Sequence, residues 1–228
     1  MGVFHAAAIV FDLDGVLVDT MPSIRATWKR WAHERNLAPD DVLAAIHMTG
    51  VELVRRFAPD VDPLAEVRRI SARQAASETA LARFDGALEL LERLPGDRWA
   101  IVTSARLEPA MRHLAMAGLP VPHVLVTAEL TARGKPDPAG YRLAAQRLGV
   151  APQECLAIED SPAGVRAARA AGMFAVGTTN THVAAELADA ALVIPSLTAL
   201  EVTLDPVEDG DGMRVGWEDG VPDLRDLA

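Results

Sequence analysis

The fold of this chain is constrained most by short apolar runs that alternate with helical stretches along most of its length. Three helical stretches, 107–117, 139–148 and 163–171, each end within one or two residues of a glycine, which is typical of helix C-termini. The apolar runs have the length of strands that are buried on both faces of a sheet. They span residues 6–11, 99–102, 124–126, 155–158, 174–176 and 191–194. Because strands and helices alternate, we predict an α/β fold with a doubly wound parallel sheet.

Residues from about 22 to 84 interrupt this alternation with helical periodicity and no strand signal. Pro22 would lie in the first turn of a helix that runs to about residue 36. Thr49 and Glu52 have the spacing of a capping box before another helix, and residues 66–81 predict a further one. We therefore predict an inserted all-helical cap domain of residues 20–85. Residues 1–19 and 86–204 together form the predicted core domain.

The final segment, residues 205–228, carries eight acidic residues and two arginines. We expect this acidic C-terminal extension to be solvated. Residues 213–217 could add a short edge strand to the sheet after the glycine-rich turn that precedes them.

Composition excludes several classes of function. Acidic residues outnumber basic ones by 32 to 22, and no basic stripe appears, so we expect no nucleic-acid partner. No signal peptide and no run of about 18 apolar residues is evident, which predicts a cytoplasmic protein with no membrane span. The single cysteine, Cys155, lies in an apolar run and is expected to be a buried structural thiol rather than a nucleophile. Nothing indicates a coiled coil, and we expect a monomer.

Polar side chains follow three of the predicted strands, and a lysine stands in a turn before a helix. Ligands of an open parallel sheet bind beyond the C-terminal ends of its strands, so these side chains should meet at one edge. The residues are Asp12, Asp14, Thr103, Ser104, Lys135, Glu159 and Asp160.

The charges of these residues indicate a site for a cation and a phosphate. Asp12 and Asp14 are close enough to repel each other, which calls for a shared proton or cation. Ligands that are oxygen atoms only favour Mg²⁺ over Zn²⁺. The strand-to-helix turn at Thr103 and Ser104 offers backbone N–H groups and a hydroxyl to anionic oxygens.

Each feature taken alone also has a structural explanation. Asp160 or Ser161 could cap a helix, Thr103 and Ser104 could be ordinary turn residues, and Lys135 could be solvated. The joint occurrence of these features is what points to phosphoryl chemistry.

Four segments resemble the four motifs of the haloacid dehalogenase (HAD) superfamily, in order and spacing, over roughly residues 6–200. They are Phe11-Asp12-Leu13-Asp14-Gly15-Val16-Leu17-Val18-Asp19-Thr20, Val102-Thr103-Ser104, Lys135-Pro136-Asp137-Pro138 and Ile158-Glu159-Asp160-Ser161-Pro162-Ala163-Gly164. The resemblance implies a HAD-like, Rossmannoid core with a helical cap.

The resemblance also implies roles for these residues. Asp12 would be the nucleophile that forms an aspartyl-phosphate, and Asp14 the general acid and base. Family members with an aspartate two positions after the nucleophile are phosphatases or phosphomutases, so Asp14 argues against dehalogenation. Mg²⁺ would be held by the Asp12 carboxylate, the Asp14 backbone carbonyl and Asp160, with Glu159 in or near its shell. The phosphoryl oxygens would be bound by Thr103, Ser104 and Lys135.

The stretch 102–177 is similar to bacterial sugar-phosphate and glycerol-phosphate phosphatases. We therefore expect a Mg²⁺-dependent phosphatase acting on a small phosphomonoester. A β-phosphoglucomutase-type phosphomutase is the alternative, and a non-catalytic phosphate-binding module is a third reading. Candidates for contacting the rest of the substrate are Asp19, Arg25, Lys29, His47, Arg55 and Arg56.

Overall fold

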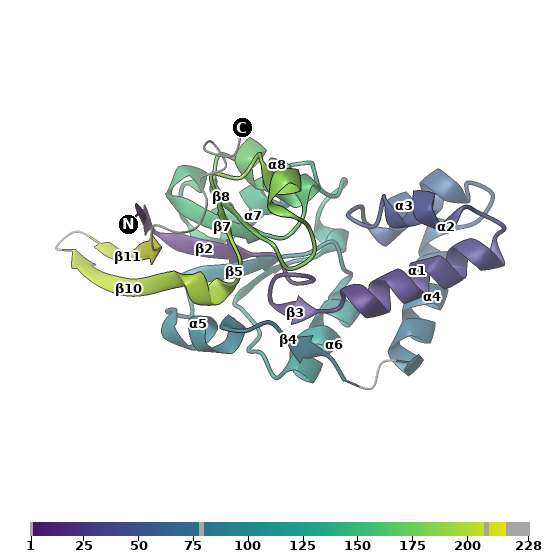
Figure 1. Cartoon of the computed structure of the whole chain (residues 1–228), viewed down its shortest axis with the longest axis horizontal. Coiled ribbons are helices and arrows are strands. Elements are labelled where there is room, and N and C mark those ends of the chain that lie inside the picture. The colour runs from purple at the N-terminus through teal and green to yellow at the C-terminus, as the bar shows by residue number, and fades with distance from the viewer. Residues whose placement is uncertain (1, 78–79, 208–209, 218–228) are drawn as a thin grey trace.

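The computed structural model describes residues 2–77, 80–207 and 210–217. At its centre lies a six-stranded sheet with the strand order β6-β5-β2-β7-β8-β9, and every neighbouring pair in it is parallel (Figure 1). The predicted doubly wound α/β fold is therefore confirmed. The strands are β2 (Ala8–Phe11), β5 (Trp99–Val102), β6 (Val124–Val126), β7 (Cys155–Glu159), β8 (Phe174–Thr178) and β9 (Leu192–Ile194).

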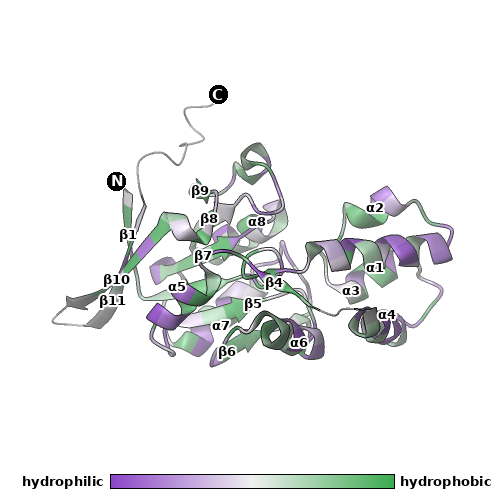
Figure 2. Ribbon diagram, turned by 60° about the horizontal axis from the view of Figure 1, so that its bottom comes forward, coloured by the Kyte–Doolittle hydropathy of each residue, from purple (hydrophilic) through white to green (hydrophobic). Residues whose placement is uncertain are grey.

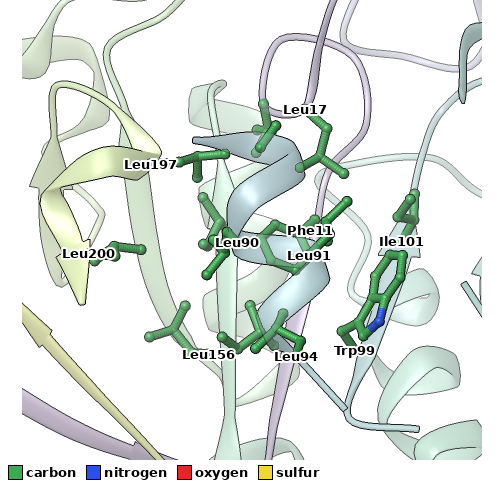
Figure 3. Packing of buried hydrophobic residues seen from close by; sticks show 14 of the residues in the cluster. Phe11, Leu17, Leu90, Leu91, Leu94, Trp99, Ile101, Leu156, Leu197 and Leu200 are labelled. Atoms are coloured by element: carbon green, nitrogen blue, oxygen red, sulfur yellow. The ribbon is translucent and has the colours of Figure 1, made fainter. Parts of the chain in front are cut away.

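Helices cover both faces of this sheet, because alternate residues of each strand point to opposite faces. Ile9 and Phe11 of β2 belong to the cluster that includes α5 (Ala87–Arg93) and α6 (Leu107–Ala117). Figure 3 shows Leu90 and Leu91 of α5 in the same cluster as Phe11, Trp99 and Ile101. Ala8 and Val10 belong to the cluster on the other face, with α7 (Ala139–Leu148) and α8 (Pro162–Ala171).

The glycines that follow three of these helices act as predicted. Gly118, Gly149 and Gly172 all adopt left-handed backbone conformations at the C-caps of α6, α7 and α8. The boundaries of α6 and α7 coincide with the predicted stretches, whereas α8 begins one residue earlier, at Pro162.

The insert between β3 and β4 is a group of four helices at one end of the molecule (Figure 1). Thr49 and Glu52 form the predicted capping box at the start of α3. Trp28 and Trp31 pack edge to face in the small core of this cap, with ring centroids 5.3 Å apart. The helices are α1 (Met21–Glu34), α2 (Pro39–Leu43), α3 (Gly50–Phe57) and α4 (Pro63–Ser77).

The expectation that residues from about 22 to 84 contain no strand is wrong. β4 (Ala82–Arg83) pairs antiparallel with β3 (Val18–Asp19), and the two form the double connection between cap and core. A two-residue strand is too short for an alternating pattern to be recognised in the sequence. The chain then re-enters the core through Gly86, whose φ of 83° is in the left-handed region.

The C-terminal segment also differs from expectation. β11 (Gly210–Trp217) is not an edge strand of the main sheet, but the middle strand of a separate antiparallel sheet with the order β1-β11-β10. Its partners are β1 (Gly2–Ala6) and β10 (Leu200–Val207), so the predicted strand 6–11 is divided between two sheets. Residues 218–228 of the predicted acidic extension lie outside the described residues.

Short 3₁₀ helices complete the connections, namely η1 (Ala128–Leu130), η2 (Pro152–Glu154), η3 (Ala184–Leu187) and η4 (Leu197–Ala199). Hydrophobic residues concentrate in the strands between the helical layers, and hydrophilic residues mark the outer sides of the helices (Figure 2). Within the described ranges, no helix combines the length and the apolar character needed to cross a membrane.

Candidate active site

Three adjacent strands bring the predicted motifs together at one edge of the sheet. β2 lies between β5 and β7 in parallel register, so the C-terminal ends of all three strands point the same way. Asp12 follows β2 and its backbone N–H donates to the carbonyl of Ile158 at 2.9 Å. Thr103 follows β5, and Glu159 is the last residue of β7. The sheet thus gathers residues that are up to about 150 positions apart in sequence, as expected for a parallel sheet.

Three buried carboxylates form the centre of the site. One oxygen each of Asp12, Glu159 and Asp160 lies within 4.8 Å of the others. Burial raises the pKa of Asp12 well above its ordinary range, and although Lys135 opposes this shift, Glu159 and Asp160 add to it. Burial, followed by the charge of Glu159, raises the pKa of Asp160 to about 7. The negative charge of the three carboxylates is not balanced by protein charges alone, so the cluster favours a bound cation.

This donor set fits a hard divalent cation. It offers oxygen atoms and no nitrogen or sulfur, which suits Mg²⁺ better than zinc. Asp12 and Asp160 are 5% and 4% exposed, so a cation there would be largely shielded from bulk water.

Lys135 joins the cluster from the turn before α7. Its Nζ lies 2.6 Å from Asp12 Oδ1 and 2.5 Å from Glu159 Oε1. Burial lowers the pKa of Lys135, but the charges of Asp12 and Glu159 outweigh burial and hold it above its ordinary value. Lys135 is therefore a permanent cation that fixes the Asp12 carboxylate.

Glu159 is fully buried and is held by several donors. Ser161 donates to its Oε2 at 3.3 Å, and the hydroxyl of Tyr141 donates to its Oε1. Tyr141 was not among the predicted site residues, although it is the only tyrosine of the chain and follows Lys135 by six positions. Ser161 also caps α8 by accepting from the N–H of Gly164, so its structural and site roles coexist.

The loop after β8 reaches the cluster from the other side. The hydroxyl of Thr181 donates to Asp160 Oδ2, and Asn180 Nδ2 donates to the carbonyl of Gly15 at 2.9 Å. A Cβ atom at Gly15 would lie 2.2 Å from Asp160 Oδ2, and the φ of Gly15 is +97°. Only glycine fits at this position without displacing Asp160.

Asp14 belongs to a different set of contacts from Asp12. Its Oδ1 accepts from Thr20 Oγ1 at 2.7 Å and lies 2.9 Å from His113 Nδ1, and its Oδ2 accepts from Thr103 Oγ1 at 3.1 Å. Burial raises the pKa of Asp14, but the hydrogen bonds from His113, Thr20 and Thr103 prevail and hold it below its ordinary value. His113 was not anticipated, because a histidine within an amphipathic helix carries no mark of a site.

A cavity of about 580 Å³ lies between the cap and the core. It is lined by Asp12, Asp14, Thr103, Ser104, Lys135 and Asp160 on the core side. Of the cap candidates, Arg25 and His47 line it too, whereas Lys29, Arg55 and Arg56 are not among the described residues that do. Asp19 is also absent from the described lining, and its backbone pairs with Ala82 at the double connection.

Two contacts hold the cap against the core beside this cavity. Ser104 Oγ donates to the carbonyl of His47 at 3.2 Å, so the hydroxyl predicted to bind phosphate also contacts the cap. The N–H of Gly134 donates to Glu52 Oε1 at 3.0 Å, next to Lys135. Cap and core therefore contact each other beside the site.

Buried acids, a lysine fixed between two of them and a cavity beneath the cap thus lie at the same edge of the sheet. A family model described as haloacid dehalogenase-like hydrolase matches residues 6–172. The chain is 41% identical over 203 residues to hexitol phosphatase A of Escherichia coli (strain K12), which covers 86% of this chain and 94% of that protein. It is 37% identical over 199 residues to validoxylamine A 7'-phosphate phosphatase of Streptomyces hygroscopicus subsp. limoneus, covering 83% and 93%.

Among solved structures, a hydrolase from Pseudomonas syringae superposes with a TM-score of 0.74 at 28% identity, covering 84% of this chain and 94% of that one. The chain belongs to the haloacid dehalogenase-like hydrolase family. Within that family it is a phosphatase.

Proposed function

We propose that this phosphatase hydrolyses the phosphomonoester of a small sugar or polyol, in two steps, with Mg²⁺ as its cofactor. The observation that carries the proposal is the division of the two aspartates. Asp12 is fixed by Lys135 within the acidic cluster, whereas Asp14 is held apart by three hydrogen-bond donors. Two carboxyl groups in different environments suit two different roles.

Asp12 acts as the nucleophile in this proposal. Its oxygen attacks phosphorus and forms an aspartyl-phosphate while the ester bond breaks. Lys135 restricts the Asp12 carboxylate and supplies positive charge for the phosphoryl oxygens. Thr103 and Ser104 lie at the start of the connection to α6, beside those oxygens. The Thr103 hydroxyl donates to Asp14 and the Ser104 hydroxyl to the His47 carbonyl, so each would exchange that bond for one to the phosphoryl group when substrate binds.

Asp14 transfers protons in both steps. It first donates a proton to the departing alcohol oxygen, and it then accepts one from the water that hydrolyses the aspartyl-phosphate. Both Asp12 and Asp14 line the cavity, where a substrate can reach them.

The Mg²⁺ ion would be held by the Asp12 carboxylate, the Asp14 backbone carbonyl and Asp160, with Glu159 in or near its shell. When bound, it would neutralise charge on the phosphoryl group and on the acidic cluster. The proximity of the three buried carboxylates supports this assignment.

The cap supports the choice of a sugar or polyol as leaving group. Arg25, His47 and Gln74 line the cavity and offer polar contacts there. The names of the two curated relatives, a hexitol phosphatase and a validoxylamine 7'-phosphate phosphatase, point to polyhydroxylated leaving groups.

Phosphate release tests the proposal directly. Purified protein with Mg²⁺ is incubated with hexitol phosphates, sugar phosphates, glycerol phosphate and phosphoglycolate, and free phosphate is measured. We expect hydrolysis of one or more polyol or sugar phosphates. Isomerisation of β-glucose 1-phosphate without phosphate release would favour the phosphomutase alternative, and inactivity across the whole panel would contradict the proposal.

A further inference from the structure

Three donors from three parts of the fold converge on the carboxyl group of Asp14. Thr20 lies between β3 and α1, where the chain enters the cap. Thr103 follows β5, and His113 lies on α6. Two of the three donors therefore belong to the core, and one belongs to the connection to the cap.

The contacts divide unevenly between the two carboxyl oxygens. Oδ1 receives two, from Thr20 at 2.7 Å and from His113 Nδ1 at 2.9 Å. Oδ2 receives a longer one, 3.1 Å from the Thr103 hydroxyl, which itself accepts from the N–H of Ala105 at 3.0 Å. Oδ2 is thus the less firmly held oxygen.

The chemistry of the pair determines which atom donates. Oδ1 carries no hydrogen, whether Asp14 is ionised or holds its proton on Oδ2, so His113 Nδ1 must carry the hydrogen in this contact. Hydrogen bonds to a charged acceptor are stronger than those between neutral groups. The contact with His113 therefore restrains rotation of the carboxyl group about its Cβ–Cγ bond.

His113 is itself firmly placed. It is 2% exposed and lies on the face of α6 that is buried with Ala110 and Leu114. A buried side chain on a regular helix keeps its position better than one in a loop. The structure consequently holds one edge of Asp14 from the core, independently of the cap helices.

We propose that His113 is a positioning residue for proton transfer, which holds Asp14 Oδ1 so that Oδ2 exchanges the proton with the reacting oxygens. In the first step the Asp12–phosphorus bond forms, the ester P–O bond breaks, and the Oδ2 proton moves to the departing oxygen. In the second step a water oxygen bonds to phosphorus, the bond to Asp12 breaks, and the water proton moves to Oδ2. The inference rests on the proposed function.

A leaving-group comparison separates this role from a purely structural one. Proton donation matters greatly when a sugar alkoxide departs, and little when p-nitrophenolate departs, because p-nitrophenolate is a much weaker base. The value of kcat/KM reports the step in which the alcohol leaves. The wild type and variants are therefore compared on the best sugar or polyol phosphate and on p-nitrophenyl phosphate.

Three substitutions of the histidine test the position of the donor. In asparagine the amide nitrogen is bonded to Cγ, as Nδ1 is in histidine, whereas in glutamine it lies one bond further out. His113→Leu removes the donor altogether. Leu114→Ala serves as the matched control, because Leu114 is a buried neighbour on the same helix that has no contact with Asp14 among the hydrogen bonds described.

We expect His113→Leu to lower kcat/KM for the sugar or polyol phosphate about 10- to 100-fold, the effect of losing one charged hydrogen bond. On p-nitrophenyl phosphate the loss should stay within about 3-fold. His113→Asn should recover most of the lost activity, and His113→Gln should not. Leu114→Ala should lower the melting temperature without changing the ratio between the two substrates.

Equal losses on both substrates, or an asparagine variant no better than the glutamine variant, would overturn the inference. If His113→Leu fails to fold, the asparagine and glutamine variants still decide between the outcomes. A wild type that hydrolyses neither substrate would instead contradict the proposed function.

Discussion

Replacing Gly164 by alanine would place a methyl group inside the space of the Glu159 carboxylate. A Cβ atom at Gly164 would lie 1.9 Å from Glu159 Cδ and 2.0 Å from each of its oxygens. Carbon atoms in contact are normally about 3.5–4.0 Å apart, so a shift of more than about 1 Å is unavoidable. Glu159 is fully buried and bonded to Lys135 and Tyr141, so moving it away from the new methyl group would disturb these contacts.

The cost of that shift can be estimated from the contacts that it breaks. A hydrogen bond to a charged group contributes about 1.5–3 kcal/mol. Alanine is a better helix former than glycine by at most about 1 kcal/mol, which offsets part of this cost in α8. We therefore expect Gly164→Ala to lower the free energy of unfolding by about 1–3 kcal/mol. Displacement of Glu159 should also release Lys135 from its position, and misplacement by 1 Å costs about 10²-fold in rate.

Urea denaturation and kcat/KM measurements test both effects. Gly96→Ala is the matched control, since its Cβ would have ordinary contacts of 3.6 Å with His123. In a Glu159→Ala background the carboxylate that the new methyl group would meet is absent. Gly164→Ala should therefore lower the free energy of unfolding only slightly in that background, and a double-mutant cycle should show a coupling energy between the two positions. Wild-type stability and activity in the single Gly164→Ala variant would refute the reasoning, as would strict additivity of the two substitutions.

Three further predictions concern the nucleophile, the cation and the cap. Asp12→Asn should abolish turnover while the melting temperature and circular dichroism stay those of a folded protein; normal turnover would exclude Asp12 as the nucleophile. EDTA should stop phosphate release and added Mg²⁺ should restore it, because the acidic cluster needs a cation; a rate unaffected by chelation would contradict the metal assignment. Arg69, with Trp31 and Arg35, lowers the pKa of Glu66 from 4.5 to about 2 in the cap. The Glu66 side chain is 8% exposed. Because its pKa is lower in the folded than in the unfolded state, Glu66 contributes about 3 kcal/mol of stability above pH 4.5. This contribution is lost as the pH falls toward 2. The difference in the free energy of unfolding between wild type and Glu66→Gln should therefore decrease between pH 5 and pH 3. A difference that does not change with pH would contradict this role of Glu66.

Local sequence patterns determined the elements of the core. Residues 99–102 and 124–126 were predicted as strands and 107–117 as a helix, and the structure has the same boundaries. Such agreement is expected where a strand is buried on both faces or a helix ends at glycine, because the pattern is then set by neighbours in sequence. Asp12, Lys135 and Asp160 could be placed together for a similar reason, since parallel strands deliver their C-terminal ends to one edge.

Contacts between distant segments were decided by the tertiary structure alone. β1 and β11 pair although about 210 residues separate them, and no local pattern specifies which strands of a chain pair. The short strands of the double connection to the cap likewise gain their hydrogen bonds only from each other.

The same distinction applies to the site. The sequence by itself determined that Asp12 and Asp14 follow a buried strand, and the resemblance of the four motifs indicated their chemistry. Only the tertiary structure decided how each is held: His113 reaches Asp14 from 99 residues away, and Tyr141 and Lys135 converge on Glu159. A hydrogen bond depends on the distance and angle between side chains, and these are fixed by packing of helices on the sheet rather than by the order of residues.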